Sequence, residues 1–166
     1  SAAFLVVLSW ATNEQTNNPW LLYLLPFAGI LIAWAYAGFG KSAAGGNNLL
    51  IDQIHDAGDS NKVPLRMFPL VLGATILTHL FGGSAGREGT AVQMGGAISG
   101  WFARVSRLSG AHTRVLLMCG ISGGFSSVFG TPLAGTVFAM EVLAMGGMRY
   151  DAIIPCLVAA IVGDLV

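Results

Sequence analysis

Charged residues are scarce in this sequence. The eight Lys and Arg and the eight Asp and Glu together make up 10% of the 166 residues, whereas a soluble domain carries about 25%. Apolar residues make up 54%, and the mean hydropathy is +0.70. So few charges cannot cover the apolar surface in water, so we expect a lipid-embedded protein. The formal net charge is zero. Nucleic-acid-binding proteins typically carry an excess of basic residues, so no nucleic-acid partner is expected.

Cysteine is also scarce, and both thiols, Cys119 and Cys156, lie in apolar stretches. We interpret them as small core residues, because a metal site needs more ligands at a regular spacing. No metal ion and no cofactor is expected. The basic segment and cleavage site of a signal peptide are missing as well. Because the sequence starts and stops inside apolar segments, we expect residues 1–166 to be a single membrane-domain fragment of a longer protein.

The plainest membrane span runs from Pro19 to Gly38 and carries no charge. About 20 such residues cross the hydrocarbon core of a bilayer. Aromatic residues near its ends, among them Trp20 and Trp34, suit the level of the lipid headgroups. Pro26 is expected to kink the helix, because its ring removes a backbone donor and clashes with the preceding turn.

The other apolar segments are shorter or broken. Residues 40–62 contain glycines, two asparagines and an amphipathic stretch that is too short to span a bilayer. A second apolar segment, Pro64 to Phe81, ends in a glycine-rich break, and a helix is expected from Glu88 to Arg104. Short helices that start with glycine are typical of membrane proteins whose helix ends face an ion or a substrate.

Three arginines without an acid, between Arg104 and Arg114, predict a cytoplasmic loop. Residues Val115 to Met145 are too long for one simple span and predict two helices that break at Gly130, and another span is expected from Ala152 onward. The whole pattern predicts an all-α, polytopic membrane protein with about seven or eight helical pieces of unequal length.

Small residues recur four positions apart in two of these segments. Gly96 and Gly100 form one such pair, and Gly120 and Gly124 form the other. Small residues at this spacing allow another helix backbone to approach closely, so each pair predicts a helix–helix contact.

The helix that follows the glycine-rich break is the best candidate for a binding site. The first N–H groups of a helix have no internal partner, and leaving them bare in lipid costs several kcal/mol each. An anion that rests on them offsets this cost and meets the positive end of the helix dipole. The sequence therefore predicts an anion site at Gly86, Arg87, Gly89 and Thr90.

Glu88 lies in the first turn of that helix. Its ionised carboxylate can occupy the place of the anion, and its protonated or displaced side chain frees that place, so Glu88 is predicted to gate the site and to carry protons. The alternative is an ordinary first-turn acid paired with Arg87. The apolar surroundings favour the functional interpretation, because ionisable groups inside a membrane are costly.

A second glycine segment precedes the short helix. Gly45, Gly46 and Asn47 could supply further donors to the same anion, although an ordinary helix cap by asparagine explains them equally well.

Two further ionisable residues lie in apolar stretches. Glu141 is a candidate internal proton site, or it reaches the surface near Arg149. His79 is interpreted as a hydrogen-bonded packing residue.

At these residues the sequence resembles the CLC family of chloride channels and proton-coupled anion antiporters. The resemblance rests on Gly86–Gly89, Ala91–Gly96, Gly130–Gly135 and Phe138–Glu141, which follow one another in the family's order. It implies a homodimer in a bacterial plasma membrane that transports chloride or fluoride, either as a channel or in exchange for protons, with Glu88 as the gating residue. It also implies two inverted repeats, of which this chain contains the first.

The motifs depart from the common family pattern at four places. Gly45 is the nearest equivalent of the serine that the family usually has in its first motif. Asn47 and Asn48 stand where the family usually has Ile-Pro, and Thr90 replaces the common proline. Val142 stands where antiporters often carry an internal proton glutamate, with Glu141 one position earlier. These departures resemble the fluoride-exporting branch of the family.

A protease is the alternative from a different class of protein. Gly120-Ile121-Ser122-Gly123 matches the Gly-x-Ser-Gly motif of rhomboid-type intramembrane proteases. That family needs a histidine base after the serine, whereas His55, His79 and His112 all precede Ser122. We therefore expect a transporter rather than an enzyme.

Overall fold

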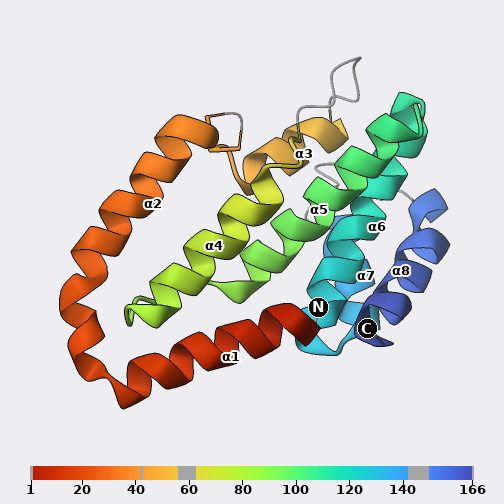
Figure 1. Ribbon diagram of the computed structural model, residues 1–166. Coiled ribbons are helices and arrows are strands. Elements are labelled where there is room, and N and C mark those ends of the chain that lie inside the picture. The colour runs from red at the N-terminus through yellow and green to blue at the C-terminus, as the bar shows by residue number, and fades with distance from the viewer. Residues whose placement is uncertain (1, 42, 56–62, 142–149, 166) are drawn as a thin grey trace.

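The computed structural model describes residues 2–41, 43–55, 63–141 and 150–165, and within them all regular structure is helical (Figure 1). Helix lengths range from nine residues in α3 to 20 in α6. This confirms the predicted all-α, polytopic class with short and broken helices. In chain order the elements are α1 (Ala2–Asn17), the 3-10 helix η1 (Pro19–Leu24), α2 (Leu25–Phe39), α3 (Asn47–His55), α4 (Met67–Leu80), α5 (Arg87–Val105), α6 (Gly110–Phe129), α7 (Pro132–Glu141), the 3-10 helix η2 (Tyr150–Ala152) and α8 (Ile153–Leu165).

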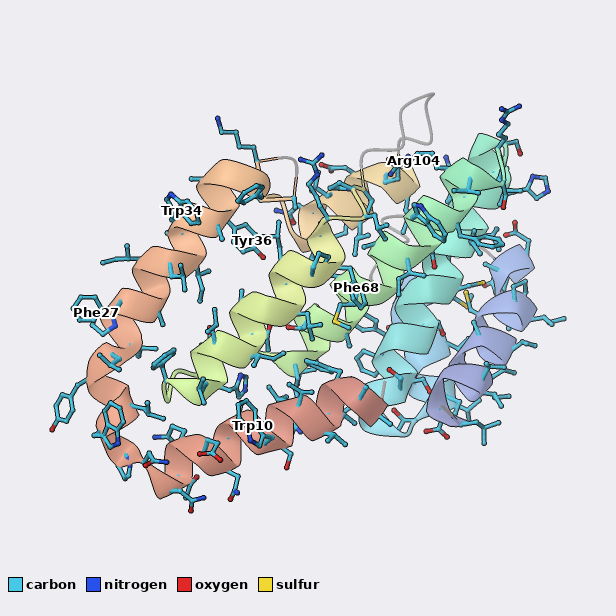
Figure 2. The ribbon with its side chains drawn as sticks, viewed as in Figure 1. Trp10, Phe27, Trp34, Tyr36, Phe68 and Arg104 are labelled. Carbon is cyan, nitrogen blue, oxygen red and sulfur yellow. The ribbon has the colours of Figure 1, made fainter. Side chains whose placement is uncertain are left out.

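The predicted span is present as η1 followed by α2. Among the described residues, Pro19–Phe39, with 21 residues, is the helical segment long and apolar enough to cross a membrane, and only 6% of its 18-residue apolar window is buried. Phe27 and Trp34 project from α2 away from the other helices (Figure 2), with exposed fractions of 68% and 65%. A soluble protein would bury so apolar a helix, so this exposure favours contact with lipid. Pro26 lies in the first turn of α2, directly after the change from the 3-10 helix η1 to the α-helix, and the expected kink stays a prediction.

The packed centre of the molecule lies between α5, α6, α7 and α8 (Figure 1). Leu117, Met118 and Ile121 of α6 are almost completely buried there. Cys119 and Cys156 are free thiols whose Sγ atoms lie 4.0 Å apart between α6 and α8. Cys156 is fully buried, which confirms its interpretation as a core residue.

Helices α5 and α6 meet backbone to backbone through glycine. A Cβ atom on Gly120 would lie 2.5 Å from the carbonyl oxygen of Gly95, and one on Gly124 would lie 2.5 Å from that of Ala91. Both distances are too short for any side chain, so the predicted close contact at Gly120 and Gly124 is confirmed. Gly96 instead faces the side chain of Leu50 in α3, so its predicted contact with a helix backbone is wrong.

The connection between α6 and α7 begins at a glycine. α6 continues through Gly123 and Gly124 and ends at Phe129, where Gly130 adopts a left-handed conformation with φ 65°. The predicted break at Gly130 is therefore confirmed, because this is the backbone conformation in which glycine commonly ends a helix.

The predicted basic loop is shorter than expected. His112 and Arg114 belong to the first turns of α6, and Arg104 belongs to the last turn of α5. Arg104 donates a hydrogen bond of 2.8 Å to the carbonyl oxygen of Val63, which fixes the end of α5 to the residues before α4 (Figure 2).

The glycine contact predicts how sensitive the fold is to one methyl group. We expect Gly120→Ala to destabilise the full-length protein by about 1–3 kcal/mol, because the helices must separate to admit the side chain. Gly73→Ala in α4 is the matched control, since its Cβ would have no neighbour within 4 Å, and it should be neutral or stabilising by about 0.5–1 kcal/mol. Thermal unfolding in detergent measures both, and equal stability of the two variants would contradict the importance of the contact.

Candidate anion-binding site

The turn between α4 and α5 aims the start of α5 toward an open side of the molecule. Gly82 adopts φ 76°, and the N–H of Gly83 donates to the carbonyl oxygen of Thr78 at 2.8 Å. Gly86 then takes an extended conformation with φ −69° and ψ 118° immediately before the first helical residue. Glycine allows the positive φ of this turn without strain, so the chain reverses within a few residues.

The first turn of α5 has the geometry expected of an anion site. No described side chain caps the helix at Gly86, so its initial N–H groups are available to a ligand. The Glu88 carboxylate bends back over this position, with Oε2 3.4 Å from the point where Gly86 would carry a Cβ. A carboxyl oxygen thus lies beside the helix start, which is where the helix dipole favours negative charge.

The alternative interpretation of Glu88 as the ion-pair partner of Arg87 has no support in the geometry. Both side chains are exposed, and among the described residues no ion pair joins them. The carboxylate lies near Gly86 at the helix start rather than in an ion pair with its neighbour in the sequence.

Thr90 has a different place from the one predicted. Its side chain is buried, and its hydroxyl lies 2.7 Å from that of Thr75 in α4 and donates to the carbonyl oxygen of Gly86 at 3.2 Å. With its proton given to Gly86, Thr90 accepts the proton of Thr75. The Thr90 hydroxyl is therefore fully used by these two hydrogen bonds, and the one to Thr75 joins α5 to α4 next to the helix start.

The structure brings the second glycine segment to the same place. A Cβ on Gly89 would lie 3.7 Å from the Asn47 Nδ2 atom, so this side-chain amide is next to the first turn of α5. Gly46, with φ 53°, lies against the amide of Gln93 one turn further along α5. Gly45, in the turn before α3, instead faces Leu49 of that helix. Asn47 is the first residue of α3 rather than its cap.

Gln93 and Thr75 were missed by the sequence analysis. Gln93 follows Gly89 by four positions, so both lie on one face of α5, and this spacing is the signal that points to Gln93. No comparable signal marks Thr75, because its partner Thr90 is in another helix.

A cavity of about 900 Å³ opens in front of the α5 start. His79 lines it, while its Nδ1 atom lies 2.8 Å from the carbonyl oxygen of Thr75. This hydrogen bond confirms the interpretation of His79 as a hydrogen-bonded residue, and only its Nε2 atom remains for the cavity. The complete lining comes from α1, the end of α4 and the start of α5: Leu5, Leu8, Ser9, Thr12, Asn13, Thr16, His79, Ser84, Ala85, Gly86, Arg87 and Glu88.

Glu141 and Ser122 lie outside this cavity. Glu141 is the exposed last residue of α7, and Arg149 is outside the described residues. Ser122 is fully buried in α6 and donates to the carbonyl oxygen of Cys156 at 3.1 Å. A serine held by a backbone carbonyl has no base to activate it, so the protease alternative is not supported.

Comparison with known proteins agrees with these motifs. The family model described as "Voltage gated chloride channel" matches residues 28–166. A "Chloride/fluoride channel protein" of Pseudomonas syringae pv. tomato is 57% identical over the whole chain, which covers 36% of that protein. An "H(+)/Cl(-) exchange transporter ClcA" of Vibrio vulnificus is 34% identical over 77% of the chain, which covers 30% of that protein.

A solved structure shares the fold. The crystal structure of a CLC-type fluoride/proton antiporter matches with a TM-score of 0.90 and 36% sequence identity, over 98% of this chain and 40% of that one. The chain thus spans between 30% and 40% of the length of these relatives. The family match, the relatives and the shared fold agree with the sequence motifs, and the chain belongs to the CLC family of voltage gated chloride channels.

Proposed function

We propose that the protein to which this chain belongs transports a small inorganic anion, chloride or fluoride, across a bacterial plasma membrane. Residues 1–166 would be its first membrane repeat, and two copies of the complete protein would form a homodimer. The names of the relatives support this transport class, since they include a chloride/fluoride channel, a proton/chloride exchanger and a fluoride/proton antiporter.

The position of Glu88 carries the proposal. Its carboxylate lies over the uncapped start of α5 at the mouth of the cavity. An ionised carboxylate there competes with an anion for the same N–H groups and the same dipole. Protonation removes the negative charge and lets the anion take its place. Glu88 would therefore act both as the gate and as the carrier of a proton.

The remaining predicted residues would supply the donors. The backbone N–H groups at Gly86, Arg87 and Gly89 would bind the ion, and Asn47 of α3, whose Nδ2 atom lies near Gly89, would add a side-chain amide. Gly45 and Gly46 would let the start of α3 approach α5 closely. Thr90 would contribute by fixing α5 to α4. Glu141 remains a proposed second proton site.

We propose fluoride as the preferred substrate. Two of the relatives quoted above are named for fluoride, and one of them is the match of 57% identity. Fluoride is small and holds its water tightly, so a site for it must provide strong hydrogen-bond donors. An amide beside a free helix start is such a donor set.

Replacing the gate tests the central claim. With the full-length protein in liposomes, anion flux should depend on pH, because Glu88 must be protonated to release the site. Glu88→Gln keeps the shape but cannot ionise, so its flux should no longer change with pH. Glu14→Gln, which alters a carboxyl group outside the cavity lining, is the control and should retain the pH response. An unchanged pH response in Glu88→Gln would rule out the gating role.

The amide beside the helix start can be tested separately. Asn47→Ala should lower fluoride flux by about tenfold, because a hydrogen bond to a charged group contributes about 1.5–3 kcal/mol. Asn48→Ala is the matched control, since it removes the same amide one position along α3 and should have little effect. Parallel measurement of chloride efflux shows whether the amide favours fluoride. Equal losses in the two variants would show that Asn47 does not contact the ion.

A further inference from the structure

Two thiols from different helices meet in the packed centre of the molecule. Cys119 of α6 and Cys156 of α8 are both free, and their Sγ atoms lie 4.0 Å apart. Neither residue lines the cavity at the start of α5, so the proposed transport mechanism does not use them. Cysteine is the most readily oxidised nucleophile among the side chains, and two thiols in contact can share one oxidation.

Neighbouring contacts hold α6 and α8 together at the level of the two thiols. Ser122, three residues after Cys119 in α6, donates to the carbonyl oxygen of Cys156 at 3.1 Å. A Cβ atom on Gly123 would lie 3.1 Å from the carbonyl oxygen of Ala159 in α8. The backbones of the two helices are therefore close to one another here, and the thiols are held in contact by the packing of the fold.

The two sulfur atoms are within reach of a covalent bond. A disulfide bond of about 2.05 Å requires them to approach by about 2 Å. A change of rotamer at one cysteine moves its sulfur by about 3 Å. Side-chain rotation thus covers the required distance, and the helices can keep the contacts made by Ser122 and Gly123.

The two thiols differ in access. Cys156 is fully buried, whereas Cys119 is half-buried. In Figure 1, α6 and α8 lie side by side and begin at the same end of the molecule, and Cys156 belongs to the first turn of α8, shortly after the exposed Tyr150. We therefore expect a small, uncharged oxidant to reach Cys119 first and Cys156 only through Cys119.

The end of the molecule at which α6 begins determines the state of the thiols at rest. Arg104 and Arg114 lie at this end (Figure 2), which is predicted to be cytoplasmic. The cytosol keeps thiols reduced, and the disulfides that form there are usually transient and redox-sensing. The pair is therefore expected to be reduced at rest and to change only when an oxidant arrives.

We propose that Cys119 and Cys156 form a redox-active thiol pair that a peroxide oxidises to a disulfide between α6 and α8. The Cys119 thiolate attacks one oxygen of hydrogen peroxide, and the O–O bond breaks. This gives a Cys119 sulfenic acid and hydroxide, which takes up the proton lost by Cys119 and becomes water. The Cys156 sulfur then attacks the Cys119 sulfur, the S–O bond breaks, and the hydroxyl group leaves with the Cys156 proton as a second water. Two thiols are oxidised to one disulfide, and one peroxide is reduced to two waters.

The contact between the sulfurs decides which product forms. A sulfenic acid without a thiol beside it is open to further, irreversible oxidation to a sulfinic acid. At Cys119 the second thiol is already 4.0 Å away, so the disulfide forms first and a thiol reductant can restore the pair. The chemistry is thus reversible because Cys156 is buried next to Cys119.

Peptide mapping tests the bond in the parent protein. Trypsin cleaves after Arg114 and Arg149 and so places Cys119 and Cys156 in separate peptides. The full-length protein in detergent is treated with hydrogen peroxide, denatured with N-ethylmaleimide to block the remaining thiols, and digested. Mass spectrometry should find the two peptides joined, with the loss of both alkylated cysteines, and a thiol reductant should separate them again. If both cysteines stay free, or if either is joined to another partner instead, the proposal is wrong.

Single substitutions test the order of the two steps. Cys156→Ser should stop the reaction at the Cys119 sulfenic acid, which dimedone labels. Cys119→Ser should leave Cys156 unmodified, because its sulfur is buried. Dimedone labelling of Cys156 in the Cys119→Ser variant, or none of Cys119 in the Cys156→Ser variant, would contradict the proposed roles.

A displaced thiol is the matched control for distance. Cys156→Ala combined with Ala160→Cys keeps one buried thiol on the same face of α8, about 6 Å further along the helix. Its disulfide with Cys119 should form at least about tenfold more slowly than that of the parent protein, because the reacting atoms no longer start in contact. Equal rates would show that the contact between Cys119 and Cys156 has no special role. These outcomes are independent of the anion site, since neither thiol lines its cavity.

Discussion

A helix start inside a bilayer must find partners for its N–H groups, and the geometry around α5 follows from this requirement. Water is absent from the hydrocarbon core, and each unpaired group costs several kcal/mol. The carboxylate of Glu88 lies beside this uncapped helix start, and the side-chain amide of Asn47 adds a further donor next to it. A site that accepts an anion is one of the few ways to satisfy these N–H groups while the position remains open to exchange.

The rest of the described structure holds that helix start in place. Glycine contacts join α5 to α6 along its length, and the hydrogen bond between Thr75 and Thr90 joins it to α4 directly behind the site. α3 is packed so that its first residue touches the first turn of α5. The candidate anion site would thus be made from segments about 40 positions apart in the sequence, and its precision would depend on their packing.

Local features of the sequence predicted local features of the structure. The helix expected from Glu88 to Arg104 is observed as Arg87–Val105, and the break at Gly130 is present. Helix bounds and breaks of this kind are indicated by glycines, charged residues and the length of apolar runs, all of which can be seen within one segment of the sequence.

Contacts between segments could not be predicted in the same way. Nothing in the sequence pairs Thr75 with Thr90, or shows that Gly96 receives the side chain of Leu50. The same holds for the contact between Cys119 and Cys156, which lie in different helices. Such pairings arise from tertiary packing, which a single sequence does not encode in any short window.

The fixation of α5 at both ends has a consequence for speed. Its start is held by Thr75, its end by the hydrogen bond from Arg104 to Val63, and its side by the backbone of α6. Opening of the site by movement of α5 would have to break all of these contacts. In the proposed mechanism the moving part is therefore a single glutamate side chain, and rotamer changes of exposed side chains take picoseconds to nanoseconds. Movement of the Glu88 side chain would then be fast, and the arrival of the proton would limit the rate of opening.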